Sequence, residues 1–126
     1  MPFDSEKFAK HLREHAKTSG QHRCAHFVRE ALEAAGADTT GYQVPAKTYG
    51  PILLRNAFHE VTVDDPATTT FIKGDVVIFQ NYPGGDVNGH IEGYDGTNWI
   101  SDFIQTGFWP SHSYVKGAAG YAVYRR

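Results

Sequence analysis

Helical periodicity is confined to the first half of this sequence, and strand-like runs fill the second half. Apolar residues recur at helical spacing over residues 5–17 and 23–35, and a short helix is expected within residues 46–58. Too few helices alternate with strands to cross over a parallel sheet. We therefore expect an α+β fold in which N-terminal helices pack on an antiparallel sheet.

The second half carries the strand signals. Strands are expected at residues 58–63, 71–79, 90–94 and 98–103, and in the closing segment AGYAVYRR. Asp95 and Gly96 suit a tight turn, because aspartate and glycine accept positive φ values. We expect this turn to join residues 90–94 and 98–103 as a hairpin.

Size and charge limit the classes of function. A chain of 126 residues predicts one catalytic domain, residues 1–126, and we expect a monomer. Its net charge of -2 comes from scattered basic and acidic residues, which argues against nucleic-acid binding. The first twenty residues hold neither the apolar stretch of a signal peptide nor a membrane span, so we expect synthesis in the bacterial cytoplasm and no membrane insertion.

The single cysteine, Cys24, is the first candidate for chemistry. It cannot form an intramolecular disulfide, so its thiol stays free. It falls at the start of the expected second helix, where unpaired N–H groups and the helix dipole favour a thiolate over a thiol. The alternative is a small buried residue under the helix end.

A base and an orienting carboxylate are expected on the hairpin. His90 follows the glycine-rich loop YPGGDVNG and heads a strand, where its ring can meet the helix N-terminus. Asp102 on the returning strand is the favoured residue to hold the imidazole. Glu92 competes for that role, since it lies two residues along the strand from His90 and so on the same face.

A zinc site is an alternative of another kind. His22, Cys24 and His26 lie within one short stretch, and His90 could complete a tetrahedral set. Residues two apart on a helix point about 200° away from each other, which argues against convergence. We therefore expect no metal.

Three segments, in order, carry a family resemblance. GQHRCAHFVREALEAAG, FIKGDVVIF and GHIEGYDGTNWISDF span residues 20–103. They resemble the nucleophile helix, the glycine-aspartate strand and the Gly-His strand of the NlpC/P60 and CHAP superfamily. The resemblance implies a papain-like fold and cleavage of amide bonds in bacterial peptidoglycan, by an endopeptidase or an N-acetylmuramoyl-L-alanine amidase without a cofactor.

The resemblance also implies residue roles. Cys24 becomes the nucleophile, His90 the base and Asp102 the third catalytic residue. Many CHAP relatives carry a glutamate and then an asparagine after the histidine, whereas WISDFIQ offers Asp102 and then Gln105.

Substrate binding is expected around these residues. The backbone N–H of Cys24 is the expected donor to the tetrahedral intermediate, joined by a side chain such as Gln21 or His22. Tyr82 and Trp109 are the expected aromatic residues of a groove for sugar or stem peptide.

The small size, the missing signal peptide and the AKTYGPIL segment resemble amidase effectors delivered by type VI secretion. This implies an antibacterial toxin that acts in the periplasm or cell wall of a target cell, with the peptidoglycan stem peptide as substrate and an immunity protein as inhibitor. A phage-type lysin or a cell-wall remodelling hydrolase is the alternative within the same chemistry. A non-catalytic or zinc-binding cell-wall-binding module is the alternative of a different class.

Overall fold

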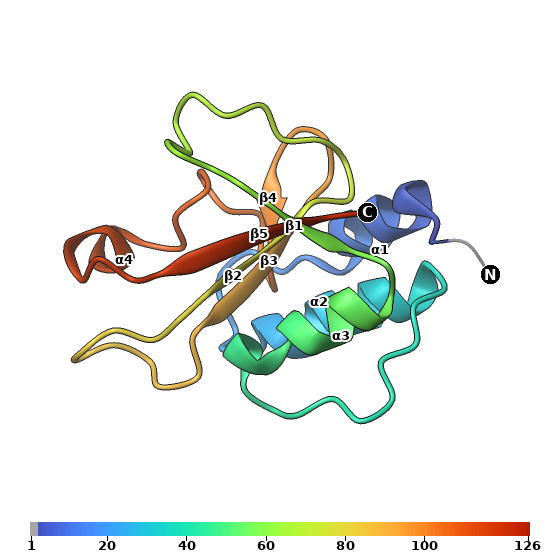
Figure 1. Ribbon diagram of the computed structural model, residues 1–126, viewed down its shortest axis with the longest axis horizontal. Helices are drawn as coiled ribbons and strands as arrows, with labels where there is room; N and C mark the ends of the chain where they lie inside the picture. Colours follow the sequence, from blue (N-terminus) through green and yellow to red (C-terminus); the bar gives the residue numbers. More distant parts are fainter. Residues whose placement is uncertain (1–2) are drawn as a thin grey trace.

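The computed structural model describes residues 3–126, in which helices pack on one five-stranded sheet (Figure 1). The helices are α1 (Ser5–His15), α2 (Cys24–Ala34), α3 (Gly50–Arg55) and α4 (His112–Lys116), with a 3-10 helix, η1 (Ala46–Thr48), before α3. The strands are β1 (His59–Val61), β2 (Val76–Phe79), β3 (His90–Tyr94), β4 (Trp99–Ile100) and β5 (Tyr121–Arg125). Every pairing is antiparallel, so the predicted α+β class is confirmed.

Helix α1 is capped at its start and ends before its expected limit. The carboxylate of Asp4 accepts hydrogen bonds from two backbone N–H groups of the first turn. The helix stops at His15 because Ala16 is extended, with φ -61° and ψ 135°. The next N–H, that of Lys17, donates to the carbonyl of Asp102 at 2.8 Å. This bond draws the chain after α1 toward the segment that follows β4.

Helix α2 begins at the cysteine, as expected. Arg23 is its N-cap residue and provides no side-chain cap. Val28 and Leu32 are fully buried on its inner face. Gly36 follows the helix with φ 102°, the left-handed conformation that glycine adopts readily at a helix end.

The sheet has the strand order β1-β5-β2-β3-β4. β3 and β4 form the predicted hairpin. In its turn the carboxylate of Asp95 accepts hydrogen bonds from the N–H groups of Thr97 and Asn98, and Gly96 has φ 100°. The expected hairpin and its turn residues are confirmed.

Two elements differ from expectation. β2 begins only at Val76, because Gly74 has φ 98° and the Asp75 carboxylate accepts a hydrogen bond from the N–H of Ile72, which makes a turn of the residues before it. The five-residue helix α4 was not predicted, since it is too short to show helical periodicity.

Side chains on the two faces of the sheet belong to two separate cores. Val76 and Ile78 point toward α1, α2 and α3, whereas Val77 and Phe79 point to the opposite face, as the two-residue period of a strand requires. The opposite face carries an aromatic layer, which consists of Phe71, Phe79, Trp99, Phe108, Trp109, Tyr114 and Tyr121. Figure 1 shows α2 and α3 on one side of the strands and α4 beyond the start of β5.

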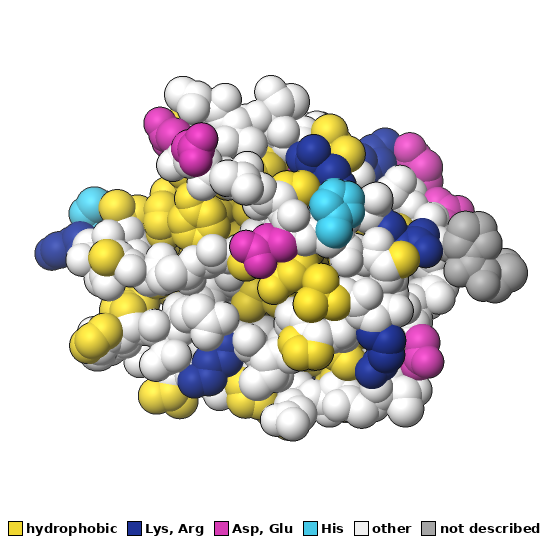
Figure 2. Space-filling model, viewed as in Figure 1, with side chains coloured by type: hydrophobic (Ala, Val, Ile, Leu, Met, Phe, Trp, Pro, Cys, Tyr) yellow, Lys and Arg dark blue, Asp and Glu magenta, His cyan; other side chains and the backbone are white. Residues whose placement is uncertain are grey.

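The distribution of surface charge and the lengths of the helices concern binding to nucleic acid and to membranes. Figure 2 shows basic and acidic side chains interspersed over the face it displays. The longest helices have 11 residues, and within residues 3–126 none is long and apolar enough to cross a membrane.

Candidate active site

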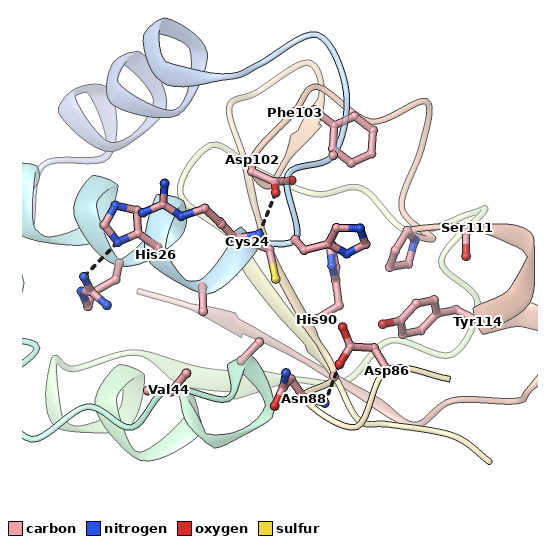
Figure 3. A pocket seen from close by; sticks show the side chains of 18 of the residues that line it. Cys24, His26, Val44, Asp86, Asn88, His90, Asp102, Phe103, Ser111 and Tyr114 are labelled. Carbon is pink, nitrogen blue, oxygen red and sulfur yellow. Dashed lines mark hydrogen bonds between the residues drawn. The ribbon is translucent and has the colours of Figure 1, made fainter. Parts of the chain in front are cut away.

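A cleft of about 600 Å³ opens beside the start of α2 (Figure 3). Its walls come from the first turn of α2, from residues 42–46, from the β2–β3 loop and from the segment that leads into α4. Cys24 and His90 both line it. The two residues that sequence reasoning placed on a helix end and a strand end therefore meet in one cavity.

Cys24 is the first residue of α2, and its position gives it free backbone donors. The first intrahelical bond runs from the N–H of Phe27 to the carbonyl of Arg23 at 3.1 Å. The N–H of Cys24 and those of the next two residues therefore have no partner within the helix. The thiol is half-buried and unoxidised, and Figure 3 shows its sulfur pointing into the cleft on the side of His90.

His90 is fixed from behind through one ring nitrogen. Its side chain is 12% exposed, and its Nε2 lies 2.9 Å from Oε1 of Gln105 and 3.1 Å from Oε1 of Glu92. Neither contact uses the other ring nitrogen, Nδ1, and Cys24 lies on the cleft side of the ring. A held imidazole next to a thiol is the arrangement that nucleophilic catalysis by cysteine requires.

The protonation of His90 follows from these neighbours. Burial disfavours the charged ring, but hydrogen bonds and attraction to Cys24 and Glu92 outweigh it and raise the pKa of His90 to about 10. Burial raises the pKa of Glu92 to about 7, against the opposing effects of His90 and Gln105. His90 is therefore an imidazolium at neutral pH, the form that can donate a proton to a leaving amine.

Gln105 reaches the ring because the chain folds back directly after β4. Its N–H donates to the carbonyl of Trp99 at 2.9 Å, and its side-chain Nε2 donates to Oε1 of Glu92 at 2.7 Å. Glu92 is fully buried, and its Oε2 has no hydrogen-bond partner within residues 3–126. The sequence singled out Glu92 through its period of two from His90. Gln105 was visible only as a departure from the family pattern.

The expected contact between Asp102 and His90 is wrong. β4 ends at Ile100, so Asp102 lies in the bend beyond the strand and not beside the ring. Its Oδ2 instead accepts hydrogen bonds from the backbone N–H groups of Gln21 at 2.7 Å and Arg23 at 2.9 Å. Asp102 lines the cleft at the start of α2, and Glu92 and Gln105 occupy the position behind the ring.

Two solved structures resemble the whole chain. One, the type VI native effector-immunity complex Tae3-Tai3 from Ralstonia pickettii, matches with 35% identity and a TM-score of 0.85 over 98% of this chain and 98% of that chain. The selenomethionine form of the complex matches with 36% identity and a TM-score of 0.81 over 94% and 98%. The chain belongs to the Tae3-Tai3 effector-immunity family. No family model and no curated protein matches the sequence.

The Tae3-Tai3 likeness covers the helices and the sheet together. Because the match spans nearly the full length of both chains, the α+β arrangement of N-terminal helices on a five-stranded antiparallel sheet is shared. The sequence resemblance to type VI effectors is thus supported at the level of an effector-immunity pair.

Of the four substrate-binding residues expected in this Tae3-Tai3 relative, two line the cleft and two do not. His22 and Tyr82 line the cleft. Gln21 does not reach it, because its side-chain Nε2 donates to the carbonyl of Ser19 at 2.9 Å. Trp109 packs in the aromatic layer, with its ring centroid 5.5 Å from that of Phe79, so its expected place in the groove is wrong.

The cleft also contains residues that sequence reasoning missed. Tyr114 comes from the unpredicted α4, and Figure 3 shows its hydroxyl pointing into the cleft near Asp86. Burial and then the nearby Asp86 raise the pKa of Tyr114 to about 12, so it stays a hydrogen-bond donor. The sequence around Tyr114 and Asp86 does not indicate that they are cleft residues, because only the tertiary fold brings their segments to the cleft.

Of the residues of the zinc alternative, His26 is engaged elsewhere. His26 is bound along α2, with Nε2 3.0 Å from Oε1 of Glu30 and Nδ1 3.2 Å from Nη2 of Arg29. In the part of the chain that the structure describes, no group of three or more histidine, cysteine, aspartate or glutamate side chains is placed to hold a metal ion.

Proposed function

We propose that this chain is the effector type of the pair: a cysteine hydrolase that cleaves an amide bond in bacterial peptidoglycan. The observation that carries the proposal is the Cys24–His90 pair in the cleft, with Glu92 and Gln105 behind the ring. The family relationship to a type VI effector-immunity complex supplies the biological setting. The papain-like superfamily inferred from the three sequence segments supplies the bond type.

The buried polar groups favour the effector over the immunity protein. Burying the Glu92 carboxyl with one oxygen unpartnered costs stability. A protein that acts only by covering its partner gains nothing from this loss of stability. In a hydrolase the buried Glu92 carboxyl has a function, because it raises the pKa of His90, the base beside Cys24.

The geometry supports a two-step acyl transfer. The sulfur of Cys24 attacks the peptide carbonyl, and His90 gives its proton to the leaving amine. A water molecule then loses a proton to His90 and hydrolyses the thioester, which releases the acid and restores the thiolate beside the protonated ring. The unpaired N–H of Cys24 can donate to the oxyanion, the charge that develops in the transition state.

The substrate is proposed to be the stem peptide of peptidoglycan, cut by an endopeptidase or N-acetylmuramoyl-L-alanine amidase activity. His22, Tyr82 and Tyr114 are the cleft residues proposed to contact it. The type VI relationship favours an antibacterial toxin over a phage-type lysin or a remodelling enzyme. By the same relationship we propose action in the periplasm of a target cell and inhibition by an immunity protein that covers the cleft.

Directed export tests this role. The chain is produced in a Gram-negative host with and without a periplasmic signal, beside Cys24→Ala made at the same level. We expect lysis only when the unaltered chain is exported. Equal growth of the exported wild type and exported Cys24→Ala would count against the proposal.

A further inference from the structure

The carboxylate of Asp102 joins two backbone groups that flank His22. Its Oδ2 accepts from the N–H of Gln21 at 2.7 Å and from the N–H of Arg23 at 2.9 Å. Asp102 is 3% exposed, so water competes little for these bonds. Hydrogen bonds to a carboxylate are stronger than those between neutral groups, so the turn at His22 is firmly held.

The residue between the two bonds has an unusual conformation. His22 has φ 58°, in the left-handed region that non-glycine residues rarely adopt. A left-handed residue lets the N–H groups on its two sides converge on one anion, the arrangement known as a nest. The Asp102 carboxylate therefore compensates for the strain that His22 stores.

This turn leads directly into the nucleophile. Arg23 is the N-cap residue of α2 and offers no side-chain cap, and Cys24 follows it. Figure 3 shows Asp102 beside the start of α2, joined to it by a hydrogen bond. Asp102 thus supplies from outside the helix the constraint that a capping side chain would normally give.

A second set of contacts ties the same loop to the same place. The N–H of Lys17 donates to the carbonyl of Asp102 at 2.8 Å. Gly20 lies against the ring of Phe103, since a Cβ added at Gly20 would lie 3.5 Å from Cε1 of that ring. Residues 17–23 therefore rest on residues 102–103 at both ends of the loop.

We propose that Asp102 is a positioning residue for the nucleophile and not the orienter of the base. It holds the turn at His22 so that the thiol and the N–H of Cys24 face the substrate carbonyl and His90. The orienting of His90 belongs to Glu92 and Gln105. The inference rests on the proposed function only in naming the reaction that Cys24 performs.

The test compares Asp102→Ala and Asp102→Asn with a matched control. Asp95→Ala removes another buried aspartate that accepts two backbone hydrogen bonds in a turn and does not line the cleft. Three quantities are measured in the full chain: hydrogen exchange of the Gln21 and Arg23 amides, the rate of Cys24 alkylation by iodoacetamide, and the Nε2–H signal of His90 by NMR.

We expect Asp102→Ala to expose both amides to exchange and to slow alkylation about tenfold, because a displaced thiol loses the helix N-terminus and the imidazolium that favour the reactive thiolate. Asp102→Asn keeps one acceptor oxygen, so its loss should be smaller. The contacts of His90 Nε2 with Glu92 and Gln105 should persist in both variants, so the NMR signal of the Nε2–H should keep its hydrogen-bonded position. Asp95→Ala should leave alkylation unchanged.

A second substitution supplies a rescue. In a His22→Gly background the turn needs less support, because glycine adopts positive φ freely. We expect Asp102→Asn to slow alkylation less there than in the wild-type background. This comparison does not use Asp102→Ala, so it can be made even if that variant does not fold.

Two results would overturn the inference: wild-type alkylation and exchange in Asp102→Ala, or loss of the hydrogen-bonded Nε2–H signal of His90 in that variant. Alkylation and exchange need no peptidoglycan. A wild-type protein that leaves peptidoglycan intact while Asp102→Ala slows alkylation would defeat the proposed function and keep this inference.

Discussion

Oε1 of the fully buried Glu92 lies 3.1 Å from Nε2 of His90. The two residues stand two apart on β3 and so project from the same face of the sheet. Water is excluded from the contact, so a change in the charge of Glu92 acts on His90 with little screening. Together with Cys24, Glu92 therefore raises the pKa of His90.

Glu92→Gln should lower the pKa of His90 from about 10 toward the ordinary value for histidine, because the substitution removes a buried negative charge next to the ring. Turnover at neutral pH should fall up to about fourfold, because a ring with the ordinary pKa is about one-quarter imidazolium at pH 7. NMR titration of the His90 ring measures the pKa. Glu30→Gln, which changes the carboxylate beside His26, is the matched control and should leave both quantities unaltered.

The free energy of unfolding should fall as pH rises through two windows. The pKa of Glu92 is raised from 4.5 to about 7, and that of His90 from 6.5 to about 10. In each window the folded chain holds a proton that the unfolded chain has lost, so stability is greatest below the unfolded pKa and declines by up to about 1.4 kcal/mol per pH unit for each such proton.

Between pH 4.5 and 6.5 only Glu92 of this pair contributes to that slope. Urea unfolding of the wild type and Glu92→Gln at a series of pH values separates its effect. The Glu92→Gln curve should be less steeply falling in this window. Parallel curves would show that Glu92 is not buried in its protonated form.

Gly93→Ala should destabilise the fold by roughly 1–3 kcal/mol, the usual cost of overpacking. A Cβ at Gly93 would lie 2.5 Å from Cζ of Phe8 and 2.8 Å from Cδ1 of Leu12, where α1 presses on β3. Thermal or urea unfolding measures the loss. Gly120→Ala, where a Cβ would meet no atom within 4 Å, is the control and should change stability little.

Trp109→Ala should lower the free energy of unfolding by roughly 2 kcal/mol, less than is usual for a fully buried aromatic residue, because Trp109 is only partly buried. Its ring contacts Phe79, Phe108 and Tyr121 and does not line the cleft. The KM of the folded variant should therefore match that of the wild type. A raised KM with unchanged stability would return Trp109 to the groove.

Local sequence patterns predicted the features of the fold that are set by residues close together in the sequence. Cys24 at a helix start and His90 at a strand start follow from periodicity and flanking turn residues, and the structure brings both to one cleft. The β3–β4 hairpin follows from Asp95 and Gly96, whose conformations are intrinsic to these residue types.

The positions of the other site residues depend on the tertiary fold, which the periodicity of the sequence does not predict. β4 has only two residues, so the chain bends before Asp102, and the fold-back brings Gln105 to His90 in its place. The strained φ of His22 and the arrival of Tyr114 from α4 are tertiary effects of the same kind. A strand that ends three residues early was enough to place Glu92, and not Asp102, beside His90.

The central claim is that Cys24 hydrolyses an amide bond of peptidoglycan. Purified muropeptides incubated with the wild type, Cys24→Ala and His90→Ala, followed by mass spectrometry of the products, test it most directly. The account predicts that the wild type cuts one amide bond and that both variants leave the muropeptides intact. Intact muropeptides in all three samples, or equal cleavage by the wild type and Cys24→Ala, would contradict it.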